Sequence, residues 1–522
     1  MLEKNGFNLI MFTKSTSIHP ILFAIFPILL IVTSNLDEVI FKDAGFSLLI
    51  VLGITTISWV FLNLFFKNKL KSGLLVSLGL ILFFSYSHFV RTASQIGIDV
   101  SALPFSHTTY AVPFYGIMLI VGVFTIIKIK KRLKDVTVFA NIIGIVIIVM
   151  LLPNVASYSL ENSNLDTINN EMDYRILHEP ELNEKPNIYY IILDEYTSDE
   201  ILSEIYNYDN QDVLSKLSQR GFHIPTNSHT NYVTSPLAIS ANLNMSYFND
   251  GKINPTLDNR NEFYNNNQIM QILKSMDYTI INMSLDYGYP EIADHHLCAP
   301  SMFVNQFHNT LIDGSLWHPF SKYFVTAGDP QRDRVNCKFS ELSNLEESFN
   351  SPFFVFAHIM SPHPPYLFGP NGESLNPEFL AIGAASWDNK SGYVNQVQYI
   401  NKKIIETVDK ILQENDSAPV IIIQGDHGTP TQLGGGGLSW TNINDESIIE
   451  RTSIFNAYYL PNVNSEIIYE GITPVNSFRI VLNNYLNGDY ELLEDKVYFS
   501  TYQDMLNFRD VTKITLKIDS KE

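Results

Sequence analysis

The first 158 residues contain five apolar runs, each close to the length that a helix needs to cross a lipid bilayer. A membrane-spanning helix takes about 20 apolar residues, because each residue adds about 1.5 Å and the hydrocarbon core is about 30 Å thick. The sequence therefore predicts an α-helical membrane domain of about five spans, in the following runs: Ile18–Asn35, Ala44–Phe66, Ser72–Val90, Val112–Ile127 and Val138–Tyr158.

Basic residues mark alternate connections between these runs. They precede the first run, separate the second from the third at Lys67–Lys71, and separate the fourth from the fifth at Lys128–Lys134. Because basic connections stay in the cytoplasm, we expect a cytoplasmic N-terminus and an extracytoplasmic location for everything after Tyr158. The fourth run is short and begins beside Pro113; if it does not cross, the large domain faces the cytoplasm instead.

The charge of the chain divides at the end of the last run. Residues 1–158 carry a net charge of +6, whereas residues 159–522 carry −26. So acidic a body would repel a polyphosphate backbone, which argues against a nucleic-acid partner. An anionic substrate would need a local cation, such as a metal ion. The predicted domains are a transmembrane domain (1–158), a polar linker (159–186) and an extracytoplasmic domain (187–522).

The chain has only two cysteines, Cys298 and Cys337, with 38 residues between them. Outside the cytoplasm the two could form a disulfide, and inside it they would be two free thiols. The sequence leaves both possibilities open.

Strand-like and helical patterns alternate through the large domain. Buried strands are predicted at Asn187–Leu193, Tyr278–Met283, Phe353–His358 and Val420–Ile423, and 3–4 apolar spacing predicts a helix over Tyr393–Leu412. This alternation indicates an α/β domain with a largely parallel sheet.

Side chains of ligand type follow several of these strands. Asp194 follows the first, and Gly425-Asp426-His427-Gly428 ends the last, with glycines that allow a sharp turn. The carboxyl ends of parallel strands are where α/β folds bind ligands. Alone, the tetrapeptide is as typical of an Asx turn with an incidental histidine. His358 and His363 end and follow the third strand, and a histidine flanked by prolines is usually a turn residue.

Ser235 stands directly before Pro236, at a predicted helix start. The pattern predicts Ser235 as the N-cap and Pro236 as the first helical residue. Most N-cap serines only satisfy backbone N–H groups. A nucleophile that attacks phosphorus or sulfur also benefits there, because the helix N-terminus stabilises the anion that develops. Position alone does not choose between these roles.

The predicted strand and helix ends bring these residues to one edge of the sheet. Two aspartates and an imidazole suit Zn²⁺, Mn²⁺ or Mg²⁺. A metal touching the Ser235 hydroxyl would lower its pKa and offset charge on a phosphate or sulfate oxygen, which makes a covalent two-step transfer plausible.

Five segments together resemble the sulfatase-like branch of the alkaline phosphatase superfamily, which includes multi-span membrane enzymes similar to lipoteichoic acid synthase and the phosphoethanolamine transferases. The resemblance covers residues 185–500 and implies an α/β sandwich of the alkaline phosphatase kind. The segments are Asn187–Glu195, Asn231–Met245, His358–Tyr366, Gln424–Gly428 and Phe455–Arg479.

Site roles follow from the resemblance residue by residue. It implies that Asp194, Asp426 and His427 bind one divalent metal together with Ser235, which matches the family's nucleophile. Thr234 is the neighbouring alternative to Ser235. His363, and less closely His358, match histidines that contact the transferred group or the leaving group.

The leading hypothesis is a phospho-group transferase of a bacterial inner membrane. It would move phosphoglycerol or phosphoethanolamine from a membrane phospholipid to an extracytoplasmic glycan or lipid, through a Ser235-bound intermediate. Sulfate-ester hydrolysis is disfavoured, because Ser235–Ile239 lacks the Cys/Ser-x-Pro-x-Arg pattern that sulfatases convert to formylglycine. The alternatives are a sulfatase or phosphodiesterase that hydrolyses its substrate, and a catalytically inert component of a polysaccharide assembly system.

Overall fold

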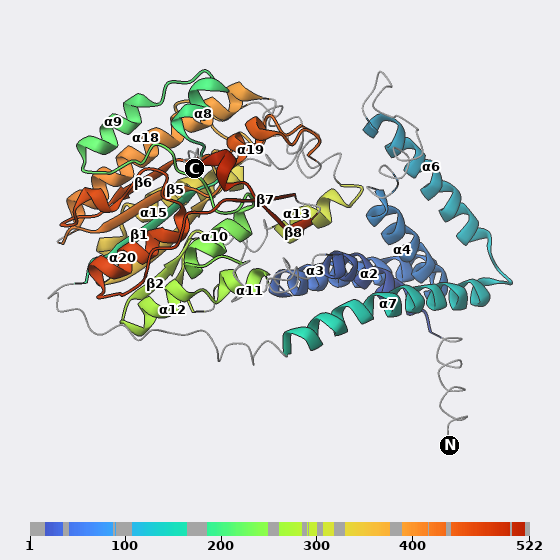
Figure 1. Ribbon diagram of the computed structural model, residues 1–522. Coiled ribbons are helices and arrows are strands. Elements are labelled where there is room, and N and C mark those ends of the chain that lie inside the picture. The colour runs from blue at the N-terminus through green and yellow to red at the C-terminus, as the bar shows by residue number, and fades with distance from the viewer. Residues whose placement is uncertain are drawn as a thin grey trace. The chain divides into compact units, whose positions relative to one another are not determined.

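The structure is a computed structural model that divides into two compact units (Figure 1). The first unit comprises residues 1–171 and 301–326, and the second comprises residues 172–300 and 327–522. The residues that the structure describes are 16–34, 41–86, 89, 107–163, 185–248, 260–283, 290, 292–299, 306–317, 329–375, 389–415, 417–434, 440–501 and 504–516.

The described residues of the first unit are mainly helical, and each of the five apolar runs overlaps one of the helices. These are α2 (His19–Ser34), α3 (Phe41–Phe66), α4 (Lys69–Phe84), α6 (His107–Lys128) and α7 (Leu133–Ser163). Two stretches among the described residues, Ala44–Phe66 and Leu133–Pro153, are long and apolar enough to cross a membrane; His19–Thr33 and Val112–Lys128 are shorter apolar helices. Most of the predicted linker, residues 164–184, lies outside the described residues.

A segment from the middle of the chain also belongs to the first unit. Its helix α13 (Gln306–Asp313) buries Phe307 in an apolar cluster with Ile28 of α2 and Ala44 of α3. Just beyond it, the backbone N–H of Leu316 donates to the carbonyl of Phe83 at 2.6 Å. The sequence pattern did not indicate that residues 301–326 pack with the apolar helices.

A six-stranded sheet forms the centre of the second unit. Its order is β3 (His295–His296), β2 (Thr279–Asn282), β4 (Phe353–Ile359), β1 (Ile188–Leu193), β5 (Val420–Gly425) and β6 (Asn456–Tyr459). Every neighbouring pair is parallel except β5 and β6, so the predicted largely parallel sheet is confirmed. β1 is central and fully buried, and its Leu193 pairs with Gly425 of β5. Chain segments leaving β1 and β5 therefore start from the same level of the sheet edge.

Helices cover both faces of this sheet (Figure 1). One face packs against α8 (Asp199–Glu204), α9 (Gln211–Gln219), α15 (Asp329–Leu342) and α18 (Lys390–Glu414). The other packs against α10 (Ser235–Asn244), α12 (Gln268–Ser275) and α20 (Ser477–Tyr485). Because successive strand residues point to opposite faces, β1 supplies Tyr189 and Ile191 to the first core and Ile188 and Tyr190 to the second.

Smaller elements complete the second unit. The remaining helices are α11 (Arg260–Asn265), α16 (Leu345–Ser348), α19 (Asp445–Thr452) and α21 (Thr512–Thr515), with 3₁₀ turns η4 (Ser465–Ile467) and η5 (Pro474–Asn476). A second, antiparallel sheet pairs β7 (Tyr498–Thr501) with β8 (Asp504–Asp510).

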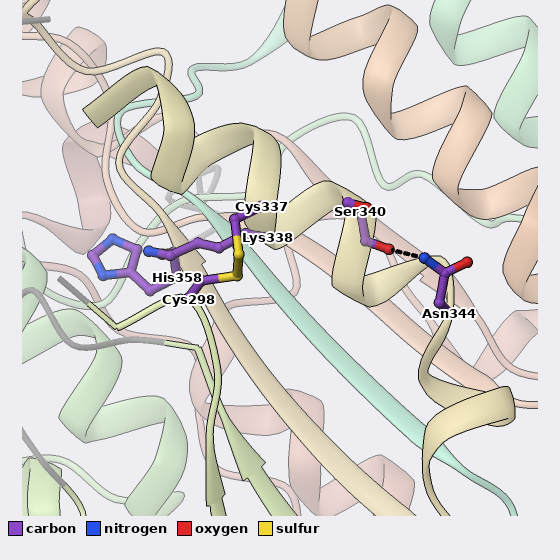
Figure 2. Close-up of a disulfide and its surroundings, with 6 residues drawn as sticks. All are labelled: Cys298, Cys337, Lys338, Ser340, Asn344 and His358. Carbon is purple, nitrogen blue, oxygen red and sulfur yellow. Dashed lines mark hydrogen bonds between the residues drawn. A yellow bond between two sulfur atoms is a disulfide. The ribbon is translucent and has the colours of Figure 1, made fainter. Parts of the chain in front are cut away.

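Cys298 and Cys337 form a disulfide that joins the segment after β3 to α15 (Figure 2). The sequence left open whether these cysteines form a disulfide or are two free thiols, and the structure has the disulfide. It closes a long loop, so in the chain-entropy account it stabilises the fold chiefly by restricting the unfolded chain.

We expect the unreduced, denatured protein to contain no thiol that iodoacetamide can alkylate and the reduced protein to contain two, as counted by mass spectrometry. Because the cysteines are 39 positions apart in sequence, the Cys298→Ser/Cys337→Ser variant should lose about 4 kcal/mol of unfolding free energy. Two alkylated cysteines in the unreduced sample would contradict the pairing.

Candidate active site

Three of the predicted ligand residues lie together at the carboxyl ends of neighbouring strands. Asp194 directly follows β1, and Asp426 and His427 directly follow β5. One ligand atom from each lies within 4.8 Å of the others, and all three residues are buried. The parallel pairing of β1 with β5 produces this proximity, as expected for the edge of an α/β sheet.

The glycines that frame Asp426 and His427 allow close approach of other backbone segments. A Cβ at Gly425 would lie 2.2 Å from the Tyr196 carbonyl oxygen, and one at Gly428 would lie 2.0 Å from that of Glu450. Neither glycine has a positive φ. The backbone bends at Asp426 and His427, but close packing rather than a positive φ requires the two glycines.

The two aspartates differ in how their oxygens are satisfied. Asp426 Oδ1 accepts the backbone N–H groups of Glu195 at 3.1 Å and His427 at 2.9 Å. Asp426 Oδ2 and both oxygens of Asp194 are buried and accept no hydrogen bond from the described residues. His358 Nε2 is 3.2 Å from Asp194 Oδ2, but the pair lacks hydrogen-bond geometry.

Burial and neighbouring charges shift the pKa values of Asp194 and Asp426 in opposite directions. Burial and the neighbouring Asp194 charge raise the pKa of Asp426 to about 7. Burial also opposes ionisation of Asp194, but His363, His358 and His427 outweigh it and lower the pKa of that carboxyl. Buried carboxylate oxygens that accept no hydrogen bond are costly, and a divalent cation would supply a partner for both Asp194 oxygens and for Asp426 Oδ2. The donor set therefore fits a divalent metal ion.

His427 presents its Nε2 atom to this cluster. Its Nδ1 is 3.2 Å from the Gly428 carbonyl, which can only accept, so we assign the ring proton to Nδ1. Burial and the nearby Arg451 charge lower the pKa of His427 well below its ordinary value. A neutral imidazole with a free electron pair on Nε2 is the form that binds metals.

Ser235 directs its hydroxyl to the cluster rather than to its own helix. Thr234 is the N-cap of α10, with extended φ −129° and ψ 139°, so the prediction of Ser235 at that position was wrong by one residue. Because Ser235 is the first helical residue, its hydroxyl is free to donate to His427 Nε2 at 3.0 Å. The Thr234 hydroxyl is buried and has no hydrogen-bond partner among the described residues.

The two further histidines border Asp194. His358 is fully buried on β4, and its carbonyl accepts a hydrogen bond from Lys338 Nζ of α15 (Figure 2). The backbone N–H of His363 donates to the Asp194 carbonyl at 3.0 Å. Burial opposes the charged form of His363, but the carboxylates of Glu195, Asp194 and Asp426 outweigh it and raise the pKa of His363. His363 is thus suited to hold a proton near the cluster.

Sequence reasoning missed Arg451, which lies beside these residues. Its side chain is 1% exposed, and its Nη1 donates to Glu195 Oε1 at 2.7 Å. Glu195 stood out only as the neighbour of Asp194. Arg451 belongs to no recognisable motif, so only the folded arrangement reveals it.

Comparison with solved structures finds distant similarities. The zinc complex of the periplasmic domain of EcEptC from Escherichia coli is 11% identical, with a TM-score of 0.44 over 65% of this chain and 98% of that one. Lipooligosaccharide phosphoethanolamine transferase A (EptA) from Neisseria meningitidis, an integral membrane protein, is 12% identical, with a TM-score of 0.41 over 91% of this chain and 94% of that one.

A comparison with curated proteins gives no match. The model of the Sulfatase family matches residues 186–469, which include the aspartates, His427, Ser235 and both further histidines. Because this match covers more than half of the chain, the protein belongs to the Sulfatase family.

Proposed function

We propose that the protein is a membrane-anchored, metal-dependent transferase that moves a phospho-group from a membrane phospholipid to an extracytoplasmic glycan or lipid. The transferred group is phosphoglycerol or phosphoethanolamine. The observation that carries this proposal is the Ser235 hydroxyl, which stands at the N-terminus of α10 and 3.0 Å from His427 Nε2. A nucleophile at this position is directed at the candidate metal ligands, and the positive end of the α10 dipole stabilises the negative charge that develops during attack.

Asp194, Asp426, His427 and Ser235 are the residues that would hold one Zn²⁺, Mn²⁺ or Mg²⁺ ion. When bound, such an ion lowers the pKa of the serine hydroxyl and offsets charge on the phosphate oxygens. The unsatisfied oxygens of Asp194 and Asp426 support this assignment, because both face the cluster without a donor from the described residues.

The protein's own side chains account for the two transfer steps. In the first, the Ser235 hydroxyl has already lost its proton to solvent, and the deprotonated Oγ attacks phosphorus, a Ser235–phosphate ester forms, and the bond to the diacylglycerol oxygen breaks. His363, whose pKa is raised by the surrounding carboxylates, gives its proton to that leaving oxygen. In the second step an acceptor hydroxyl attacks the ester and releases Ser235, and His363 takes the proton back.

Two features favour phospho-group transfer over sulfate hydrolysis. Ser235–Ile239 lacks the arginine of the formylglycine pattern, so a sulfatase nucleophile cannot be made there. The apolar helices of the first unit would hold the enzyme at a bilayer, where a lipid head group is at high effective concentration.

Contacts within the first unit support an extracytoplasmic large domain. Leu316 bonds to Phe83 in the last turn of α4, and His308 packs against Phe46 near the start of α3 with ring centroids 6.0 Å apart. Both helix ends lie opposite the basic connection at Lys67–Lys71. In sequence, the large domain both precedes and follows the segment that carries His308 and Leu316. We therefore expect the large domain on the non-cytoplasmic side.

A labelling experiment tests the nucleophile. Incubation with phospholipid radiolabelled in its head group should leave label on the wild-type chain and none on Ser235→Ala. Ser240→Ala is the matched control, because Ser240 is a buried serine of the same helix. Label that persists on Ser235→Ala and disappears on Thr234→Val would assign the nucleophile to Thr234 instead.

Product analysis separates transfer from hydrolysis. A transferase should release diacylglycerol and modify a glycan or lipid acceptor, with turnover that rises with acceptor concentration. Release of free phosphoglycerol or phosphoethanolamine at a rate independent of acceptor would identify a hydrolase.

Metal removal should destabilise the wild-type protein. A metal present at 100 times its Kd contributes about 2.7 kcal/mol, and its loss also restores the repulsion between Asp194 and Asp426. Chelation should therefore lower the Tm of the wild type but not that of Asp426→Asn. Without metal, Asp426→Asn should be more stable than the wild type. Asp212→Asn, at an exposed helix position, should behave like the wild type. Fewer than one metal ion per wild-type chain, by elemental analysis, would contradict the site.

Cysteine labelling tests the topology. A membrane-impermeant maleimide added to intact cells should label Asp212→Cys in the large domain, whose side chain is 81% exposed. Lys131→Cys, at an exposed position of the Lys128–Lys134 connection, should be labelled only after the cells are permeabilised. The reverse pattern would put the large domain in the cytoplasm.

A further inference from the structure

One buried side chain contacts all three segments that carry the candidate site. Arg451 of α19 donates from Nη1 to Glu195 Oε1 and to the Gly428 carbonyl, both at 2.7 Å. Its Nε donates to the carbonyl of Val233 at 3.1 Å. Glu195 adjoins Asp194, Gly428 adjoins His427, and Val233 lies two residues before Ser235. The guanidinium therefore joins the strand end of β1, the strand end of β5 and the start of α10.

The ion pair with Glu195 controls a strained turn. Glu195 has φ +61°, a left-handed conformation that is uncommon for a residue with a side chain. In this conformation its N–H donates to Asp426 Oδ1 at 3.1 Å, and its carbonyl accepts from the Tyr393 hydroxyl at 2.7 Å. The bond to Arg451 fixes the Glu195 side chain, so the turn that orients Asp426 is held from both its backbone and its side chain.

Stability alone does not explain the buried ion pair between Arg451 and Glu195, because removing two charges from water costs free energy. Arg451 and Glu195 are each 1% exposed, and a buried ion pair often gives no more stability than well-packed apolar residues of the same size. The planar guanidinium offers donors in fixed directions, which a lysine cannot reproduce with a single ammonium group.

We infer that Arg451 is a positioning residue for the candidate metal site. It sets the spacing of Asp194, His427 and Ser235 through the Glu195 side chain and two backbone carbonyls, and it thereby sets the affinity of the site for metal. The inference rests on the proposed function. Arg451 Nη2 also lies 3.3 Å from His427 Nε2, but a metal would use that same electron pair, so this contact has no part in the proposed role.

Arg479 provides a matched control within the same domain. It is a partly buried arginine of α20 that also bonds to backbone carbonyls, at 2.6 Å to Met245 and 2.6 Å to Glu491. Met245 is the C-cap of α10, so Arg479 braces the end of that helix remote from Ser235. Losing Arg479 should disturb the fold in the same manner as losing Arg451 without moving the metal ligands.

The test measures Co²⁺ and Zn²⁺ binding to the full-length, detergent-solubilised protein, by chelator competition and by the visible absorption of bound Co²⁺. Arg451→Met should bind either metal about 10- to 100-fold more weakly than the wild type and should change the Co²⁺ spectrum. Arg451→Lys should recover less than a tenth of the lost affinity, because it keeps the charge and loses the fork. Arg479→Met should keep wild-type affinity and spectrum.

Two results would overturn the inference. One is wild-type affinity and spectrum in Arg451→Met, and the other is an equal loss in Arg479→Met, which would indicate general loosening of the fold. If Arg451→Met does not fold, Glu195→Gln replaces it, since it removes the ion pair with almost no change of shape, and unchanged metal affinity there would also overturn the inference. Metal binding is measured without lipid. If the wild type transfers no head group while Arg451→Met still binds metal more weakly than the wild type, the result counts against the proposed function and not against this inference.

Discussion

The main electrostatic demand on the candidate site comes from three buried carboxylate oxygens that accept no hydrogen bond from the described residues: both oxygens of Asp194 and Oδ2 of Asp426. Asp194 and Asp426 stand at the same edge because Leu193 pairs with Gly425 in parallel β1 and β5. A shift of β5 by one residue against β1 would turn the β5 side chains to the opposite face and change the position of Asp426 relative to Asp194. With the register fixed, burial and the Asp194 charge raise the pKa of Asp426 to about 7, and a cation would relieve the repulsion.

A third buried carboxylate, Glu450, shows by contrast that the lack of hydrogen-bond donors from the described residues is particular to Asp194 and Asp426 Oδ2. Glu450 is fully buried, yet it accepts the Thr429 hydroxyl at 2.7 Å and the backbone N–H groups of Thr431 at 2.9 Å and Gln432 at 2.8 Å. The same domain therefore satisfies a buried carboxylate completely where the group only braces a loop. Asp194 accepts no hydrogen bond from the described residues, although its Oδ2 lies 3.2 Å from His358 Nε2. A ligand from outside the chain is the simplest explanation of this contrast.

The sheet and the apolar helices could be predicted because each depends on a long local pattern. Continuous apolar runs identified β1, β4 and β5, and their parallel direction, though not their order in the sheet, followed from the intervening helices. The detail around Ser235 could not, because one residue decides whether a hydroxyl caps its helix or faces a neighbour. Arg451 and residues 301–326 act through contacts between distant parts of the sequence, which composition and periodicity do not record.

The need for a cation follows from two independent properties of the chain. The sequence gives residues 159–522 a net charge of −26, so an anionic head group that approaches this domain is repelled before any specific contact forms. The fold adds three carboxylate oxygens that accept no hydrogen bond from the described residues, close to His427, to which the Ser235 hydroxyl bonds. Arg451 does not remedy either, because its charge is already matched by Glu195. In the proposed function, a divalent ion bound at Asp194 and Asp426 would cancel the local repulsion and attract phosphate, and both substrate binding and Ser235 chemistry would depend on it.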